Sequence, residues 1–231
     1  MSHERTCPFS MRNRAKIRVM GGLAIENNTM AMGGGTVGIS AAGGNPDIVR
    51  NAICGAKWGI VVAGGAPSIR DHNRIENNTV PGQGYGLYVT STSPFDVTDN
   101  NTFSNNLKAG IYLGAGTNVA IRDNNTISGN HYGIWINKSA VVFANQTWWN
   151  DIEGNDVGIY AEDPGTGYYF HAECNYWNNL SGPFDNSTGS PDYNPLGQGQ
   201  YVSDFFHYRN EITNDPYWLK QTSLTATSCK A

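Results

Sequence analysis

Three aspartates recur at a fixed place in this 231-residue chain and are the first candidates for chemistry. Asp71, Asp99 and Asp123 each lie four residues before an apolar residue that itself repeats. Neighbouring carboxylates repel one another unless one is protonated or a cation lies between them. Such a row could bind Ca²⁺, or supply the acid and the base for cleaving or epimerising a uronic acid polymer.

Basic side chains accompany this row. An arginine beside it could act as a base or bind a sugar carboxylate. Should the protein be an enzyme, we predict a catalytic set of Asp71, Asp99, Asp123, His72 and Arg74. The competing interpretation is that aspartate opens each turn by bonding to nearby backbone, as Asp and Asn often do.

A row of aromatic residues is the second candidate site. Each ring comes two residues after a recurring glycine, and the apolar residue between them points inward, so the ring points outward. The row comprises Tyr88, Tyr112, Trp135 and Tyr160. Aromatic rings with polar edges suit stacking on a sugar chain. Alternatively, the rings stabilise one another, lie under the C-terminal tail, or form a contact between two copies of the protein.

Both rows arise from an internal repeat. The segment 121–136 repeats the segment 97–113, so that Asn125 takes the place of Asn101. A unit of about 24 residues cannot close a core alone and must stack on copies of itself.

Four sets of residues follow this repeat. The apolar anchors are Ile25, Ile53, Ile75, Phe103, Ile127 and Ile152. Two residues before the anchors comes an asparagine row of Asn51, Asn73, Asn101, Asn125 and Asn150. Three residues after them comes a second row of Asn28, Asn78, Asn106, Asn130 and Asn155. The glycine row is Gly38, Gly59, Gly86, Gly110, Gly133 and Gly158. Agreement among four rows makes chance a poor explanation.

These rows predict an all-β fold, a single-stranded right-handed parallel β-helix of about seven rungs with a period of about 24 residues. Stacked asparagines should bond to one another up the stack. We expect an N-terminal cap over residues 1–18 and the β-helix over 19–183. An irregular, aromatic-rich C-terminal tail over 184–231 should cover the far end or one wall. The glycine-rich segment 31–45 should be loose.

The composition and charge of the chain argue against some classes of function. The net charge is −4 and 15% of residues are charged, which argues against a nucleic-acid partner. No apolar run approaches the about 18 residues of a transmembrane helix. Residues 1–20 lack the apolar core of a secretory signal peptide.

Cysteines and histidines are scattered. A zinc site is not expected, because Cys7, Cys54, Cys174 and Cys229 lack any C-x-x-C spacing. A disulfide such as Cys174–Cys229 and buried free thiols remain alternatives. The spacing of His131, His171 and His207 matches no H-x-H or H-x-x-x-H pair of metal ligands.

The repeats resemble a known family. The segment 121–136 (IRDNNTISGNHYGIWI), and the later segments 175–183 (NYWNNLSGP) and 194–202 (NPLGQGQYV), resemble right-handed parallel β-helix repeat proteins of the pectin-lyase-like superfamily. Asn178 departs from the glycine usual in that closing segment. The resemblance covers about residues 20–180 and implies an extracellular, periplasmic or cell-surface location.

That superfamily includes lyases, hydrolases, epimerases, sugar binders and adhesins, and its catalytic signatures are mostly missing here. The resemblance therefore implies a protein that binds polysaccharide through the aromatic row, or a structural repeat module. The alternative is a polysaccharide lyase, glycoside hydrolase or epimerase using the aspartate row. Expected partners are a polysaccharide and, through an exposed aromatic wall, a second copy of the chain. The one cofactor considered is Ca²⁺ at the aspartate row.

Overall fold

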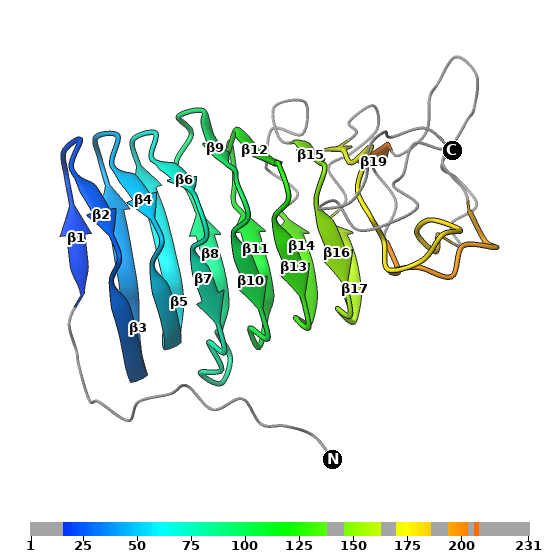
Figure 1. Ribbon diagram of the computed structural model, residues 1–231, viewed down its shortest axis with the longest axis horizontal. Coiled ribbons are helices and arrows are strands. Elements are labelled where there is room, and N and C mark those ends of the chain that lie inside the picture. The colour runs from blue at the N-terminus through cyan, green and yellow to red at the C-terminus, as the bar shows by residue number, and fades with distance from the viewer. Residues whose placement is uncertain (1–15, 138–145, 163–169, 186–193, 203–205, 208–231) are drawn as a thin grey trace.

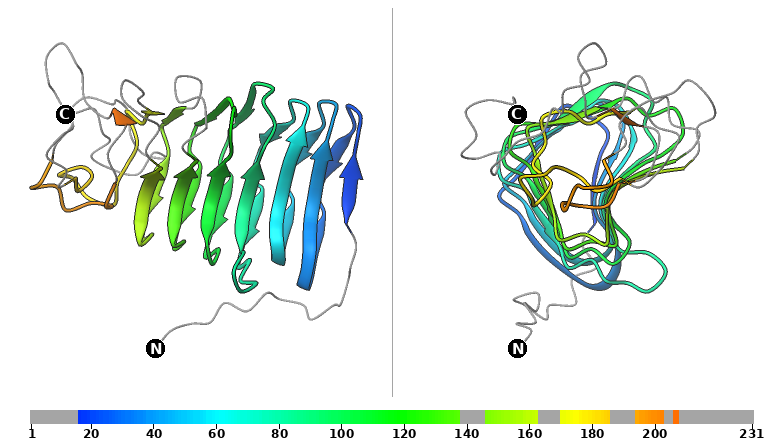
Figure 2. Two further views of the ribbon diagram at one scale, coloured as in Figure 1. Left: turned by 180° about the vertical axis from the view of Figure 1, so that it is seen from behind. Right: turned by 90° about the vertical axis from the view of Figure 1, so that its right-hand side faces the viewer.

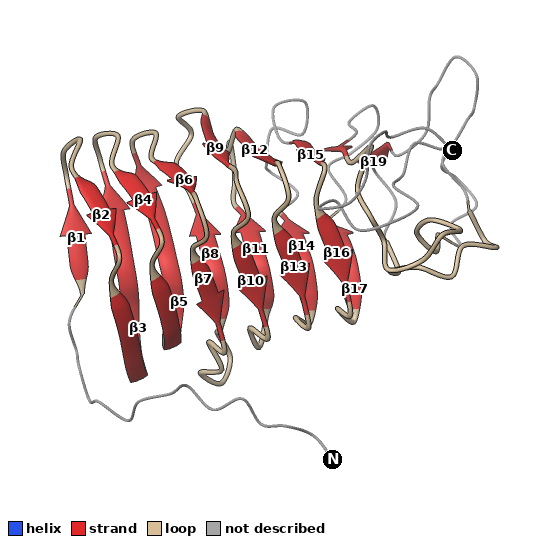
Figure 3. Cartoon of the chain, viewed as in Figure 1, coloured by secondary structure: helices blue, strands red, loops and turns tan. Residues whose placement is uncertain are grey.

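The computed structural model describes residues 16–137, 146–162, 170–185, 194–202 and 206–207. This part of the chain consists of strands, turns and loops, without a helix (Figure 3). Successive coils stack along one axis (Figure 1), and an end-on view shows them superposed around a closed interior (Figure 2). The stack has about six turns with a period of about 24 residues, which confirms the predicted all-β parallel β-helix.

Two parallel sheets form the walls of the stack. The 11-stranded sheet contains β1 (Ile17–Val19), β3 (Thr29–Ala42), β5 (Ala52–Gly64), β7 (Arg74–Glu76), β8 (Tyr85–Val89), β10 (Thr102–Ser104), β11 (Ala109–Leu113), β13 (Thr126–Ser128), β14 (Tyr132–Ile136), β16 (Asp151–Glu153) and β17 (Val157–Ala161). The 8-stranded sheet contains β2 (Ala24–Glu26), β4 (Asp47–Val49), β6 (Ser68–Arg70), β9 (Phe95–Val97), β12 (Val119–Arg122), β15 (Gln146–Trp148), β18 (Phe170–His171) and β19 (Phe206–His207). Three short strands such as β9, β10 and β11 make one coil, as predicted.

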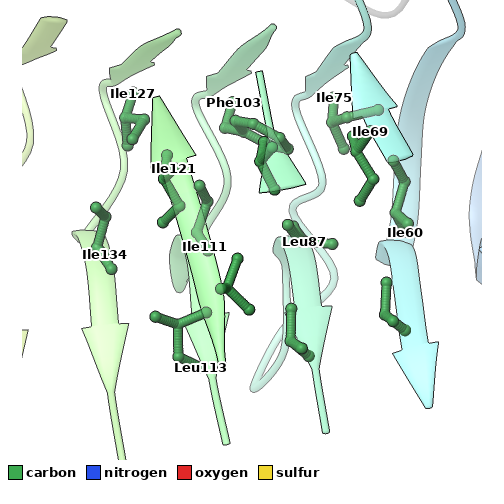
Figure 4. Packing of buried hydrophobic residues seen from close by; sticks show 14 of the residues in the cluster. Ile60, Ile69, Ile75, Leu87, Phe103, Ile111, Leu113, Ile121, Ile127 and Ile134 are labelled. Carbon is green, nitrogen blue, oxygen red and sulfur yellow. The ribbon is translucent and has the colours of Figure 1, made fainter. Parts of the chain in front are cut away.

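Apolar side chains fill the interior in rows parallel to the axis (Figure 4). Ile60, Leu87, Ile111 and Ile134 are register partners from coil to coil, and all four are fully buried. Burying a side chain of this size stabilises the fold by about 1.5–3 kcal/mol. Because each side chain packs against its equivalents above and below, the core exists only in the stack.

Two ladders of asparagine amides run up the stack. In the first, each Nδ2 donates to the Oδ1 of the next coil at 2.9–3.2 Å. Its members are Asn28, Asn51, Asn73, Asn101, Asn125, Asn150 and Asn175. The second ladder has amide distances of 2.8–3.0 Å. Its members are Asn78, Asn106, Asn130 and Asn155. These bonds confirm the predicted ladder, at about 0.5–1.5 kcal/mol each.

The glycine row exists because the second ladder lies against the backbone. A Cβ added to Gly110 would lie 2.8 Å from the carbonyl oxygen of Gly133 and 2.9 Å from Nδ2 of Asn130. A Cβ on Gly86 would lie 2.5 Å from the carbonyl oxygen of Gly110. No larger residue fits this row without displacing the neighbouring coil.

The first coil departs from the predicted register. Ile25 pairs with Ile48 in the 8-stranded sheet, while Met30 takes the anchor position opposite Ile53. The assignment of Ile25 to the anchor row was therefore wrong. Asn28 likewise belongs to the first ladder, not the second, because its amide donates to Asn51.

A repeated motif explains this error. Residues 25–29 and 75–79 both read IENNT, but only Ile75 lies on an anchor strand, whereas Ile25 lies in the 8-stranded sheet.

The expectation that the segment 31–45 is loose was wrong, because β3 runs through most of it. A register shift between Ala31 and Gly35 absorbs the additional residues as a bulge. The template spacing fails where a bulge lengthens the coil, although the strand persists.

Residues beyond the repeat close the C-terminal end. Trp177 is fully buried, and the Gln200 Oε1 accepts the backbone N–H of Asn155 at 2.7 Å, ending the second ladder. Val202 bridges Ile159 in parallel. Residues 200 and 202 of the tail therefore contact the last described coil.

The expectations for residues 1–15 and for most of 184–231, including Cys7 and Cys229, lie outside the described residues. The division into cap, β-helix and tail stays a prediction. The described part of the chain has no helix with the length and apolarity needed to cross a membrane.

Candidate functional site

The predicted aromatic row lies on the outer face of the 11-stranded sheet. Tyr88, Tyr112, Trp135 and Tyr160 are register partners on β8, β11, β14 and β17. All four are partly exposed, whereas the residue on either side of each is buried. Strand alternation thus places one ring per coil on the same outer wall.

Three further rings join this row, and the sequence interpretation did not include them. Trp58 lies 6.1 Å from Tyr88, and Tyr85 lies 5.2 Å from the same ring, measured between centroids. Tyr132 lies 4.9 Å from Tyr160. We call the seven rings the aromatic wall: Trp58, Tyr85, Tyr88, Tyr112, Tyr132, Trp135 and Tyr160. Each of these three rings directly precedes a row glycine, which is the signal that could have found them.

The rings of the wall differ in orientation. Tyr88 and Tyr112 stack at 4.6 Å with planes 10° apart, and Tyr132 and Tyr160 stack with planes 23° apart. Trp135 stands at 87° to Tyr112, with centroids 5.3 Å apart. Trp135 therefore joins two stacked pairs while lying in neither.

A small residue makes room for this arrangement. Ala109 is the register partner of both Tyr85 and Tyr132, and it is fully buried. Above this gap Trp135 lies nearly parallel to Tyr85, with centroids 6.4 Å apart and planes 27° apart.

Charged and amide groups border the wall. The Lys108 Nζ lies 4.8 Å from the Trp135 ring centroid and 5.6 Å from that of Tyr85, within cation–π range. The Trp135 Nε1 donates to the Glu162 Oε1 at 3.0 Å, and the Asn137 Nδ2 donates to the Glu162 Oε2 at 3.2 Å. Trp135 thus has a cation over its ring and a carboxylate at its indole N–H.

Burial raises the pKa of two phenols of the wall. It raises the pKa of Tyr85 to about 12, with a smaller contribution from neighbouring Tyr88. Burial is also the main cause that raises the pKa of Tyr112. These hydroxyls therefore remain hydrogen-bond donors at any physiological pH.

The predicted aspartate row lies in tight turns. Asp71, Asp99 and Asp123 have φ values of 59°, 63° and 65°. The Asp71 and Asp99 carbonyl oxygens accept backbone N–H groups of the preceding coil, from Arg50 at 3.0 Å and His72 at 3.1 Å. Aspartate tolerates this left-handed conformation better than most residues.

Each carboxylate of the row finds a partner close by in sequence or in the adjacent coil. The Asp99 Oδ2 accepts from the Thr98 hydroxyl at 2.8 Å, and Asp123 pairs with Arg122 at 2.6 Å. Asp71 pairs with Arg50 and His72. These local pairs account for the row without a bound ion.

The two basic members of the predicted catalytic set differ in their contacts. The Asp71 carboxylate meets the His72 Nδ1 at 2.8 Å, and that hydrogen bond is the main cause that lowers the pKa of Asp71 below 3.8. Arg74 pairs with Glu76 at 2.8 Å and is exposed. Arg74 thus has a carboxylate partner outside the predicted set.

Metal ligands are sparse. In the ranges that the structure describes, no three His, Cys, Asp or Glu side chains group to hold a metal ion. This includes the three aspartates considered for Ca²⁺. The histidine Nδ1 atoms meet carboxylates: His72 with Asp71, His131 with Asp156, and His171 with Glu173. The His207 side chain lies outside what is described.

The described cysteines do not supply thiolates. Cys54 and Cys174 are both disulfide-bonded. Disulfides persist in oxidising compartments such as the bacterial periplasm. For Cys174 the expected partner, Cys229, lies outside the described residues.

Comparison with known proteins gives one match. The family model described as periplasmic copper-binding protein (NosD) matches residues 11–180, which is most of the chain. That family consists of right-handed parallel β-helices in the pectin-lyase-like superfamily, and its periplasmic description confirms the expected location outside the cytoplasm. No curated protein and no solved structure matches.

Copper does not fit the residues described. Copper sites use imidazole, thiolate and thioether ligands. Met30 and Met32 are buried in the core, and the two described cysteines are oxidised. The histidines lie in separate coils, each with its own carboxylate.

Proposed function

The chain belongs to the NosD family of periplasmic β-helix proteins, and from that premise we propose that it binds an extended polysaccharide along the aromatic wall. The observation that carries the proposal is the unbroken row of partly exposed rings over four successive coils. Coils of a parallel stack repeat every ~4.8 Å. This spacing is close to the length of one pyranose unit, so an extended glycan lying along the axis would meet about one ring per sugar.

The orientations of the rings assign different roles to them. Tyr88 and Tyr112 use faces against each other, so they offer edges and hydroxyls to a ligand. Trp135 stands across the stack and is the platform on which a sugar ring would lie. Tyrosine hydroxyls and a tryptophan face together suit a ligand that is apolar on its faces and polar at its edges.

The polar groups at the rim support the same ligand. Lys108, Asn137 and Glu162 converge on Trp135 from the two edges of the wall. Sugar-binding sites combine an apolar surface with a few fixed donors and acceptors. The carboxylate and amide would accept and donate hydrogen bonds to hydroxyls of a sugar lying on Trp135.

Alanine substitutions test this function. Trp135→Ala and Tyr112→Ala should lose binding on a glycan array and in affinity electrophoresis. Both variants should melt several degrees lower yet remain folded at room temperature, because each lost aromatic pair contributes about 0.5–1.5 kcal/mol and 1 kcal/mol corresponds to about 2–4 °C. Tyr201→Ala, in the C-terminal cap and off the wall, is the matched control and should bind as the wild type does.

Other results would point elsewhere. If both variants unfold, or if the wild type binds no glycan, the wall is structural and the protein is a repeat module. If size-exclusion chromatography gives a dimer that Trp135→Ala dissociates, the wall is a contact between copies. Each of these outcomes rejects glycan binding by the wall.

Catalysis by the aspartate row is the alternative function. Asp71, Asp99 and Asp123, with His72 and Arg74, would cleave or epimerise a uronic acid polymer. A panel of uronate and neutral glycans, incubated with and without Ca²⁺, tests it. Absence of any product would reject this activity, and no described group of carboxylates favours it over binding.

A further inference from the structure

Trp135 is the ring that connects the two ends of the aromatic wall. On one side lie Trp58, Tyr85, Tyr88 and Tyr112, joined to one another at centroid distances of 4.6–6.1 Å. On the other side, Tyr132 and Tyr160 lie 4.9 Å apart. Within the described residues, every ring contact between the two groups passes through Trp135, from Tyr85 and Tyr112 to Tyr132 and Tyr160.

All seven rings belong to the two aromatic types that lose an electron readily, and the wall contains no phenylalanine. Ring-to-ring contact couples neighbouring π systems, so that a radical formed on one ring can pass to the next. From this chain of contacts we propose that the aromatic wall is a relay that carries one-electron oxidising equivalents along the axis of the β-helix. The reactant class is a one-electron oxidant that reaches an exposed ring.

Glu162, beside Trp135, can accept the proton that the indole loses on oxidation. Oxidation of indole makes its N–H strongly acidic, and the N–H of Trp135 already donates to Glu162 at 3.0 Å. A carboxylate at hydrogen-bond distance can accept that proton and return it. Glu162 is therefore a positioning and proton-holding residue for the relay.

The electron and proton balance is simple. An oxidant takes one electron from a ring of the first group, and a tyrosine there releases its phenol proton to solvent. Trp135 refills that ring, which takes a proton back from solvent, as the Trp135 N–H proton passes to Glu162. The resulting indolyl radical takes an electron from Tyr160 and recovers its proton from Glu162. The net change is one electron from Tyr160 to the oxidant and the phenol proton of Tyr160 released to solvent.

A tethered photo-oxidant tests the relay in the full chain. Thr90 is exposed and directly follows the strand that carries Tyr88, so a ruthenium tris(bipyridine) label on Thr90→Cys, its attachment confirmed by peptide mapping, lies at one end of the wall. After flash excitation with a cobalt(III) quencher, tyrosyl radicals are captured by a nitroso spin trap and located by mass spectrometry. We expect trap adducts on Tyr132 and Tyr160 as well as on Tyr88.

Trp135→Phe decides the outcome, because phenylalanine keeps a ring in place but is not oxidised under these conditions. It should abolish the adducts on Tyr132 and Tyr160 while those on Tyr88 remain. Trp148→Phe, on β15 in the other sheet, is the matched control and should leave the pattern unchanged. Near-ultraviolet circular dichroism checks that both variants are folded.

Two results would overturn the relay. One is unchanged labelling of Tyr160 in folded Trp135→Phe, which would mean that the oxidant reaches Tyr160 without the wall. The other is wild-type labelling confined to Tyr88 and Tyr112. Neither result bears on glycan binding, which is measured without an oxidant.

Discussion

The asparagine ladders and the aromatic wall are two products of the same register, one inside the stack and one outside. In the ladders each buried amide is used completely: Asn125 accepts from Asn101 and donates to Asn150, Val97 and Arg122. On the wall the rings contact one another, and all except Tyr85 remain partly exposed. Stacking thus brings residues of one type together in both places. The buried asparagines have no hydrogen-bonding group left for a ligand, whereas the rings of the wall do present a surface to one.

Removing one asparagine from a ladder should cause the largest loss of stability. Asn130→Ala removes the acceptor of the buried backbone N–H of Asn106 and one of the two acceptors of its side-chain amide, which keeps only the Ile75 carbonyl. Each unsatisfied group costs about 1–3 kcal/mol, so we expect the unfolding midpoint in urea to fall steeply. Thr126→Ala, on the outward face of the same coil, should change it little. Similar midpoints for the two variants would contradict a structural ladder.

Crowding a ladder should cause the next largest loss. Gly110→Ala places a methyl group 2.8 Å from the carbonyl oxygen of Gly133 and should cost about 1–3 kcal/mol in the free energy of unfolding. Gly43→Ala is its control, since no atom lies within 4 Å of the added carbon. A stable Gly110→Ala protein would mean that the coils separate easily at this row.

Substitutions of Asp99 should cause a smaller loss of stability, and they separate the effect of the turn conformation from that of the carboxylate charge. Asp99→Ala puts alanine at a positive φ and should cost about 1 kcal/mol, whereas Asp99→Asn should stay within about 0.5 kcal/mol. Thermal melts of the two variants give the comparison. Equal destabilisation by both would assign the carboxylate itself a role that the turn does not explain.

The smallest effect is expected at alkaline pH, on the wall. Because burial raises the pKa of Tyr85 from 10.0 to about 12, the unfolded chain ionises first. The stability that depends on the neutral phenol is present below pH 10 and is lost as the pH rises toward 12. Tyr85→Phe should lose less stability than the wild type between about pH 8 and about pH 11. Parallel losses in urea melts would show that Tyr85 ionises freely in the folded protein.

Sequence periodicity predicted the rows but not their surroundings. Asn101 and Asn125 could be paired in advance because the coils between Asn73 and Asn150 have regular lengths. The assignment failed in the first coil because residues 25–29 repeat the letters IENNT of residues 75–79 while Ile25 lies in the other sheet. A local motif alone cannot tell which of the two sheets its residues join.

The site was predicted in part for a similar reason. The four register partners of the wall follow from their fixed distance after glycine. Trp58, Tyr85 and Tyr132 share another place in the repeat, directly before the glycine, but their contacts depend on side-chain directions across coils. The bond from Trp135 to Glu162 joins residues 27 apart, which no local pattern encodes.

A single comparison tests the distinction between scaffold and site most directly: the free energies of unfolding of Asn125→Ala and Tyr112→Ala, measured side by side in urea. Asn125→Ala should lose several times more stability than Tyr112→Ala, because it removes the acceptor that the buried backbone N–H and side-chain amide of Asn101 share and the donor to Asn150. Equal losses, or a larger loss from the tyrosine, would mean that the outer wall holds the fold together and is not a surface available for binding.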